Sequence, residues 1–188
     1  MISIKNLNKN YGSTVVLKDM NLELGSGRIV GLVGPNGSGK TTLLKILAGL
    51  TSDYTGKVLI EGSEPGVDTC AIVSFLPEKT YLSDWMRSVD AIDYFNDFYA
   101  DFDRLKANEM LTQLRLNPKQ KIKTMSKGMQ EKLQLTLVMA RNAKVYLLDE
   151  PIAGVDPATR SLIMDALLKQ YCEDSLMVFA THLISDVE

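Results

Sequence analysis

The stretch that decides the fold is Gly34-Pro35-Asn36-Gly37-Ser38-Gly39-Lys40-Thr41, which Thr42 continues. It matches the P-loop pattern: a short apolar run at residues 28–33 precedes it, and a helical pattern at residues 40–50 follows it. Glycines let the backbone curl so that successive amides point at an anion, and a helix N-terminus adds the positive end of its dipole. We therefore expect this stretch to bind the phosphates of a nucleotide.

Two side chains of this stretch and two acids farther along the chain fit the chemistry of a nucleoside triphosphate. Lys40 is expected to reach the β- and γ-phosphates, and the Thr41 hydroxyl is expected to ligate Mg²⁺. A buried-strand pattern at residues 144–148 ends in Asp149 and Glu150, whose side chains point in different directions. Asp149 is the expected partner for Mg²⁺, directly or through water, and Glu150 is expected to polarise an attacking water. Considered alone, this junction would favour two acids in solvent, but the presence of the P-loop favours the functional interpretation.

The rest of the chain alternates strand and helix patterns, so the sequence predicts an α/β fold with a parallel-sheet core. An antiparallel β-subdomain is expected at the N-terminus, and a helical pattern at residues 81–123 predicts an inserted α-helical lobe. Asp156 and Pro157 are typical of a helix start, with the acid as cap and the proline in the first turn. The expected strands are residues 2–7, 16–24, 28–33, 58–60, 70–76, 145–148 and 176–180.

Composition excludes several classes of protein. The chain has 188 residues, of which 45% are apolar and 23% charged, a balance typical of one globular domain with a small inserted lobe. With 21 basic and 23 acidic residues, its formal charge of −2 gives no electrostatic footprint for nucleic acid. No apolar run is long enough to span a membrane. Two cysteines, Cys70 and Cys172, are too few for a disulfide scaffold and are expected to be free thiols.

A further motif between the two sites carries a family resemblance. Thr124-Met125-Ser126-Lys127-Gly128-Met129-Gln130 stands directly before a helical pattern and resembles the signature loop of the ABC ATPases. The other landmarks of that family follow in its order. They are Tyr11 at the aromatic position that stacks on adenine, Glu78 at the usual glutamine, residues 153–156 at the loop after the second carboxylate motif, and His182 at the switch histidine.

The resemblance covers essentially the whole chain and implies an ATPase with ATP and Mg²⁺ as its cofactors. Lys40, Glu150 and His182 would be catalytic, and Thr41, Glu78 and Asp149 would hold the metal. Tyr11, residues 34–42, Ser126 and Gly128 would bind nucleotide, with the last two acting on the ATP of an opposite subunit. Two ATP molecules would then be held between two ATPase subunits, identical or different. Hydrolysis would remove the γ-phosphates and let the two subunits separate.

Three positions depart from the family pattern. Lys127 replaces the usual first signature glycine, Met129 replaces the usual glutamine after the second glycine, and Glu78 is a carboxylate where an amide is usual. Glu78 is expected still to ligate or hydrate Mg²⁺ while changing phosphate release or coupling. Lys40, Asp149, Glu150 and His182 are all retained, so a competent hydrolase is expected.

The resemblance also implies the organisation of the chain. A single ABC ATPase domain is expected over residues 1–188, with an α/β core at 1–79 and 139–188 and a helical lobe with the signature loop and its helix at 80–138. The family continues with more helix and strand beyond the position of Glu188, which favours a shortened C-terminus.

The expected function is the ATP-hydrolysing subunit of a membrane transporter, which resembles the drug and bacteriocin exporter branch of bacterial ABC transporters. Its partners would be an integral membrane permease on a separate chain and a second ATPase subunit, with no nucleic acid, at the cytoplasmic face of the plasma membrane. Tyr81 and Trp85 are expected to receive a short helix of the permease. One alternative is a non-transport ABC ATPase acting on DNA or the ribosome, although tandem cassettes and a long coiled coil are not found. Another is a P-loop small-molecule kinase, which would leave the signature loop and His182 unexplained.

Overall fold

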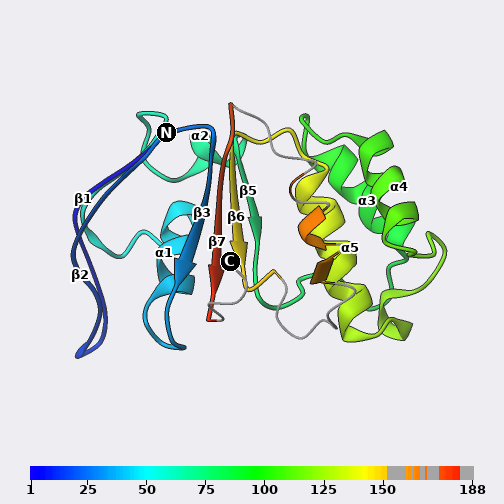
Figure 1. Cartoon of the computed structure of the whole chain (residues 1–188), viewed down its shortest axis with the longest axis horizontal. Coiled ribbons are helices and arrows are strands. Elements are labelled where there is room, and N and C mark those ends of the chain that lie inside the picture. Colours follow the sequence, from blue (N-terminus) through cyan, green and yellow to red (C-terminus); the bar gives the residue numbers. More distant parts are fainter. Residues whose placement is uncertain (152–159, 162, 166–167, 169–173, 183–188) are drawn as a thin grey trace. The chain divides into compact units, whose positions relative to one another are not determined.

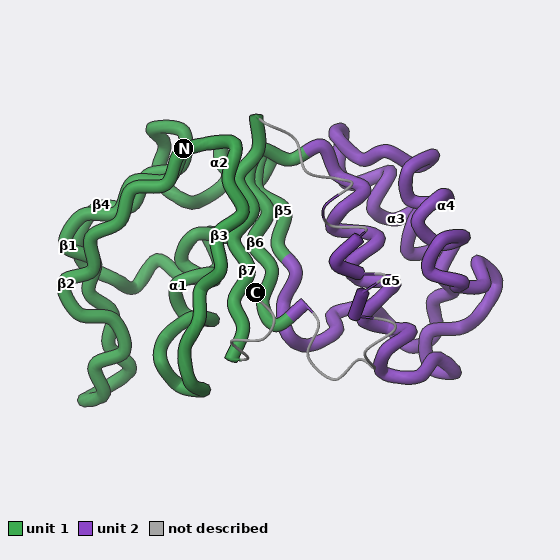
Figure 2. Tube along the Cα trace, in the orientation of Figure 1, with its two compact units in different colours: residues 1–75, 143–150, 172–188 green, residues 76–142, 151–171 purple. Residues whose placement is uncertain are grey.

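The computed structural model describes residues 1–151, 160–161, 163–165, 168 and 174–182. The chain divides into two compact units, shown in two colours in Figure 2. Unit 1 comprises residues 1–75, 143–150 and 172–188, and unit 2 comprises residues 76–142 and 151–171. The expected α/β fold, with an antiparallel sheet, a parallel sheet and helices, is confirmed.

The first sheet of unit 1 is antiparallel, in the order β2-β1-β4. Its strands are β1 (Ile2–Tyr11), β2 (Thr14–Leu24) and β4 (Thr55–Ile60). The hairpin register pairs Tyr11 with Thr14, so two residues make the turn, and Gly12 takes a φ of 57° there. One face of β1 is buried through Ile2, Ile4 and Leu7. These strands are the half-buried antiparallel pair that the alternating sequence predicts.

The second sheet of unit 1 has the order β3-β7-β6-β5 and holds the predicted buried strands (Figure 1). Its strands are β3 (Arg28–Val33), β5 (Val73–Leu76), β6 (Val145–Asp149) and β7 (Leu176–Thr181). β7 pairs in parallel with β3 on one side and with β6 on the other. Every residue of β6 and β7 is buried, as expected for the inner strands of a parallel sheet. The carboxyl ends of β3, β6 and β7 therefore meet at one edge.

Helix α1 (Lys40–Leu47) begins at the end of the P-loop and is shorter than the helix predicted to residue 50. It ends in a Schellman motif, in which the Leu50 amide bonds the Lys45 carbonyl at 2.9 Å and the Gly49 amide bonds the Ile46 carbonyl at 3.0 Å. Gly49 has a φ of 71°, a left-handed conformation that favours glycine and ends the helix.

The strand predicted at residues 70–76 is wrong in its first half. A short helix, α2 (Val67–Cys70), ends at the first residue of the predicted strand, a turn follows at residues 71–72, and β5 begins only at Val73. The Thr69 hydroxyl bonds the amide and the carbonyl of Gly66, and the Ile72 amide bonds the Thr69 carbonyl at 3.0 Å. These local bonds close a helical turn, which the apolar run in the sequence does not reveal.

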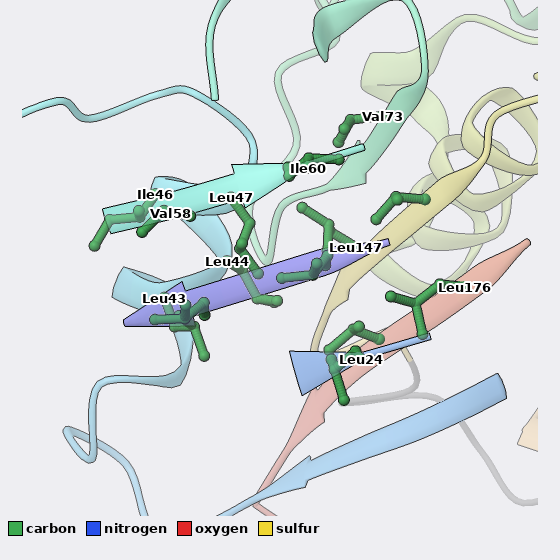
Figure 3. Close-up of a cluster of buried hydrophobic side chains, with 14 of the residues drawn as sticks. Leu24, Leu43, Leu44, Ile46, Leu47, Val58, Ile60, Val73, Leu147 and Leu176 are labelled. Carbon is green, nitrogen blue, oxygen red and sulfur yellow. The ribbon is translucent and has the colours of Figure 1, made fainter. Parts of the chain in front are cut away.

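The core of unit 1 lies among its two sheets and α1. Figure 3 shows this cluster, in which Leu44 and Leu47 of α1 meet Leu147 of β6 and Ile60 of β4. Leu44, Leu147 and Ile60 are fully buried. The P-loop helix is thereby packed against the strand that ends in Asp149, so a shared apolar core determines where both functional segments lie.

Unit 2 is helical, in agreement with the helical pattern of its sequence. Its elements are α3 (Ser88–Phe98), α4 (Arg104–Gln113), a 3₁₀ turn (Ile122–Thr124) and α5 (Lys127–Met139). On α4, the side chains of Ala107, Met110 and Leu111 are buried. The predicted helix start at Asp156 and Pro157 lies outside the described residues, as does Cys172. No described helix is long and apolar enough to cross a lipid bilayer.

Candidate nucleotide-binding site

The P-loop curls between β3 and α1 because several of its backbone positions favour glycine. Gly37 and Gly39 have φ values of 81° and 94°, in the left-handed region. At Gly34 an added Cβ would lie only 2.9 Å from the Ser38 hydroxyl oxygen. The Gly34 amide donates to the Thr181 carbonyl of β7 at 3.3 Å, so the start of the loop is bonded to the neighbouring strand.

Gly39 also packs tightly against the β1–β2 hairpin. An added Cβ would lie 2.9 Å from the Leu17 side chain and 3.0 Å from the Val16 carbonyl oxygen. Because Leu17 pairs with Lys9 of β1, this contact brings the tip of the hairpin beside the P-loop.

The Lys40 ammonium group lies inside the P-loop. It donates to the Gly34 carbonyl at 2.7 Å and to the Pro35 carbonyl at 3.1 Å, and only 8% of the residue is exposed. A buried cation held by loop carbonyls is positioned to exchange those contacts for phosphate oxygens, which bind an ammonium group more strongly. The role of Lys40 toward the β- and γ-phosphates stays a prediction.

Thr41 and Asp149 are brought together from distant parts of the chain. The Thr41 hydroxyl at the start of α1 donates to an Asp149 carboxylate oxygen at the end of β6, at 3.1 Å, and Asp149 is 2% exposed. Hydroxyl and carboxylate oxygens are ligands that Mg²⁺ prefers, and Mg²⁺ commonly takes only one or two protein oxygens beside phosphate and water. No cluster of three or more acid, His or Cys ligands occurs among the described residues.

Glu150 and His182 form a second pair at the same sheet edge. The Nδ1 atom of His182 lies 3.0 Å from a carboxylate oxygen of Glu150. The Glu150 side chain is 11% exposed and that of His182 38% exposed, so the pair faces partly outward. The Glu150 amide bonds the Ala180 carbonyl at 2.9 Å, which ties the residue to β7. The two residues predicted to act on water and on the γ-phosphate are therefore in direct contact.

Tyr11 is the last residue of β1, in the hairpin that packs against Gly39 of the P-loop. About half of Tyr11, 52%, is exposed. A second residue, not predicted from the sequence, touches it: the Lys9 ammonium group lies 4.5 Å from the centroid of the Tyr11 ring. Lys9 is also 2.8 Å from a carboxylate oxygen of Asp53. The signal in the sequence that points to this pair is the period of two along a strand, which puts Lys9 and Tyr11 on one face.

The remaining predicted residues belong to unit 2. Ser126 is the N-cap of α5, and its hydroxyl accepts a hydrogen bond from the Met129 amide at 3.3 Å. Gly128 lies in the first turn of that helix, and Glu78 is exposed on the segment after β5. The predicted loop at residues 153–156 lies outside the described residues.

The family comparison decides what this arrangement is. A family model described as ABC transporter matches residues 17–153, which include the P-loop, the signature loop, Asp149 at the end of β6 and Glu150 after it. The chain belongs to the ABC transporter family. It is an ATP-binding subunit of that family, and its relatives bear the same description.

Relatives of this ABC subunit come from archaea and bacteria. An uncharacterized ABC transporter ATP-binding protein of Methanocaldococcus jannaschii is 32% identical over 100% of this chain and 70% of its own length. A lantibiotic transport ATP-binding protein of Streptococcus pyogenes is 27% identical over 100% of this chain and 82% of its own. The chain spans between 63 and 70% of the length of the first three curated relatives it matches.

A solved structure of the same kind agrees with the fold. The dimeric structure of MJ0796, a bacterial ABC transporter cassette, superposes with a TM-score of 0.87 at 26% identity, over 99% of this chain and 90% of that one. The same cassette has also been solved as a dimer in a post-hydrolysis state bound to ADP and Pi.

One unusual feature of this ABC subunit lies in the signature helix. Lys127, at the usual glycine, forms an ion pair with Glu131 one turn later, at 3.7 Å. Burial raises the pKa of Glu131 above its usual value, and the Lys127 charge opposes that change. One oxygen of the Glu131 carboxylate has no hydrogen-bond partner among the described residues. Lys127 therefore carries a cation at the start of α5 and partly compensates the half-buried acid one turn later.

Proposed function

We propose that this ABC subunit binds ATP at the P-loop of unit 1 and hydrolyses it with the residues at the adjoining sheet edge. The observation that supports this most is the convergence of two contacts there, Thr41 with Asp149 and Glu150 with His182. The loop amides and Lys40 bind the phosphates, and the exposed face of Tyr11 stacks on adenine. Thr41 and Asp149 hold Mg²⁺, which when bound neutralises charge on the β- and γ-phosphate oxygens.

In this proposal Glu150 acts on the attacking water. Its carboxylate accepts a proton from the water as the oxygen approaches the γ-phosphorus. His182 donates from Nδ1 to that carboxylate and so orients it beside the γ-phosphate. The direct contact of the two side chains, 3.0 Å between Nδ1 and a carboxylate oxygen, supports this division of roles.

We propose that hydrolysis is coupled to dimerisation. Ser126 and the amides at the start of α5, Gly128 among them, form a helix N-terminus suited to an anion. In a head-to-tail dimer this end would contact the nucleotide held by the other subunit. The dimeric state of the cassette that this chain resembles supports the arrangement. The ATP would then hold the subunits together, and loss of the γ-phosphate would release them.

The partner of the dimer is proposed to be an integral membrane permease on a separate chain, which places this subunit at the cytoplasmic face of the membrane. In unit 2, Trp85 and Tyr81 are exposed by 71% and 47%, respectively. Exposed aromatic side chains are typical anchors of protein interfaces. We assign them to a short helix of the permease, and a loss of permease binding in a Trp85→Ala variant would be expected. The lantibiotic transport relative supports the exporter branch.

Glu78 is proposed to ligate or hydrate Mg²⁺ during the same hydrolytic cycle. It stands where the family usually has glutamine, and its carboxylate adds a negative charge near the phosphates if it reaches Mg²⁺. The expected consequence is slower phosphate release rather than loss of ATP binding.

The experiment that tests the proposal uses Glu150→Gln. The amide keeps the size of the side chain but cannot accept the proton, so hydrolysis is expected to fall by about 10²–10⁴-fold while ATP affinity is retained. With saturating Mg-ATP the variant should sediment as a dimer, and without nucleotide as a monomer. Glu109→Gln, an exposed acid of α4, is the matched control and should hydrolyse ATP at the unsubstituted rate. Undiminished hydrolysis by Glu150→Gln would refute the assignment.

A further inference from the structure

Lys9 is a buried lysine on β1 whose charged end lies against the ring of Tyr11. The residue is 3% exposed, and its ammonium group is 4.5 Å from the centroid of the ring. A cation within about 6 Å of an aromatic face is attracted by the negative potential of that face. Because Lys9 and Tyr11 are two residues apart on one strand, their side chains leave the same face of the sheet. The lysine thus lies against one side of the ring.

Lys9 is itself held from a second direction. Its ammonium group lies 2.8 Å from a carboxylate oxygen of Asp53, in the segment that joins α1 to β4. The Asp53 side chain is 94% exposed, whereas that of Lys9 is 2% exposed. The aspartate therefore holds the ammonium group near the end of β1, and the apolar stem of the lysine is buried beneath it.

The hairpin that carries this cluster is packed against the P-loop. Lys9 pairs with Leu17 across the hairpin, and Leu17 is the side chain that an added Cβ at Gly39 would meet at 2.9 Å. A movement of Lys9 or Tyr11 therefore takes place next to the point where the phosphates bind. The charge of Lys9 itself is directed to Asp53 and to the ring, so its action is expected at the base of a nucleotide rather than at the phosphates.

We infer that Lys9 is a positioning residue for the base of the nucleotide: held by Asp53, it fixes the Tyr11 ring and closes one of its faces. The other face is then presented in one orientation for adenine to stack on. Without the lysine a half-exposed tyrosine at a strand end would sample several rotamers, and binding would have to order it. This inference rests on the proposed role of Tyr11, and it adds Lys9 and Asp53 to the residues that determine base recognition.

The test separates the base from the phosphates by comparing the affinities for ADP and for inorganic pyrophosphate. Lys9→Met removes the cation and keeps the buried stem. It is expected to weaken ADP binding about two- to fivefold, the range of one cation–π contact, and to leave pyrophosphate binding unchanged. Lys9→Arg keeps a cation over the ring and should recover most of the ADP affinity. Lys5→Met, an exposed lysine of the same strand, should change neither affinity.

A double variant identifies the ring as the target. In a Tyr11→Ala background, Lys9→Met should weaken ADP binding no further, because the ring on which the lysine acts is gone. Unchanged ADP affinity in Lys9→Met, or an equal loss for ADP and pyrophosphate, would overturn the inference. If Lys9→Met does not fold, Asp53→Asn decides, since that side chain is exposed. It should weaken ADP binding alone, and unchanged ADP binding there overturns the inference.

The same variants distinguish this inference from the proposed function. Undiminished ADP binding by Tyr11→Ala would overturn the adenine role of Tyr11 and with it the role of Lys9. A loss in Tyr11→Ala without any loss in Lys9→Met would overturn the role of Lys9 alone.

Discussion

Glu150, the residue proposed to act on the attacking water, has a backbone conformation that residues other than glycine seldom adopt. Its φ is 51°, and its amide is held by the Ala180 carbonyl of β7. Such a conformation costs on the order of 1–3 kcal/mol and persists only where the surrounding structure enforces it. The packed carboxyl ends of β6 and β7 provide that enforcement, and they direct the carboxylate to His182. The backbone strain thus lies at Glu150, whose orientation matters for the proposed attack of water.

Gly39 is the residue of the P-loop where a substitution should be most harmful. Gly39→Ala would put a methyl group 2.9 Å from Leu17, in a left-handed conformation that alanine disfavours. We expect a loss of about 1–3 kcal/mol in the free energy of unfolding, together with weaker nucleotide binding. Chemical denaturation and ADP titration would measure the two effects.

Gly25→Ala is the control for that substitution. A Cβ at Gly25 would meet nothing within 4 Å. Its effect on both quantities should be small, and an equal effect at the two glycines would contradict the steric explanation.

Glu131 should make the stability of the protein depend on pH. Burial raises its pKa in the folded protein above the ordinary value of 4.5, so ionising it costs more in the folded than in the unfolded state. Stability from this group is greatest below pH 4.5 and falls as the pH rises through the raised pKa. Glu131→Gln should therefore melt at a higher temperature than the unsubstituted protein at about pH 7. Melting curves should converge as the pH falls below 4.5; an advantage that persists in acid would point to another cause.

At the scale of the elements, the sequence predicts the helices, strands and loops that are determined by residues close together in the chain. The P-loop, the antiparallel strands and the buried strands β6 and β7 follow from glycine spacing and from periods in the apolar residues. The short helix α2 and the early end of α1 do not, because each depends on hydrogen bonds between specific backbone groups.

The sequence likewise predicts some features of the candidate site and not others. Glycines and acids next to strand ends identify it in the sequence, because parallel strands bring their carboxyl ends to one edge. The contacts of Thr41 with Asp149 and of Glu150 with His182 depend on the strand order β3-β7-β6, which no local pattern contains. The period of two along β1 puts Lys9 on the same face as Tyr11, but it does not reveal that the lysine charge is buried against the ring.

The start of α4 offers a prediction about a whole element. Asp103 is its N-cap, and the carboxylate accepts a hydrogen bond from the Lys106 amide at 3.0 Å. Asp103→Ala leaves that amide without its acceptor and should lower the free energy of unfolding by about 1 kcal/mol. Urea denaturation followed by circular dichroism would detect the change. Glu109→Ala, at an exposed position inside the same helix, should have almost no effect, and a comparable loss there would argue against capping.

At the scale of the whole molecule, the two units each have a hydrophobic core of their own. The core of unit 1 contains Leu44 and Leu147, and the core of unit 2 contains Ile92, Leu111 and Leu133. The nucleotide phosphates are assigned to unit 1, whereas the end of α5 that is proposed to meet a partner belongs to unit 2. Binding and assembly can therefore be disrupted separately.

A substitution at Ser126 should separate the two steps. In the Glu150→Gln background, Ser126→Arg places a bulky side chain at the proposed contact with the partner's nucleotide. The ATP-dependent dimer should be lost in sedimentation, while ADP affinity of the monomer stays unchanged, because the monomer does not use its own Ser126. Asn108→Arg, on the exposed side of α4, is the control and should still dimerise. A dimer that survives Ser126→Arg would refute the head-to-tail arrangement.

The central place of β7 has a consequence for how the protein is made. This strand lies between β3 and β6, bonds the start of the P-loop through Thr181 and holds Glu150 through Ala180. A ribosome, however, synthesises it after all of those segments. Until residue 181 has left the exit tunnel, β3 and β6 lack the strand that joins them, so the growing chain has no finished pocket. Nucleotide capture should therefore wait for the synthesis of β7, and exposed strand edges before that point would be natural targets for chaperones.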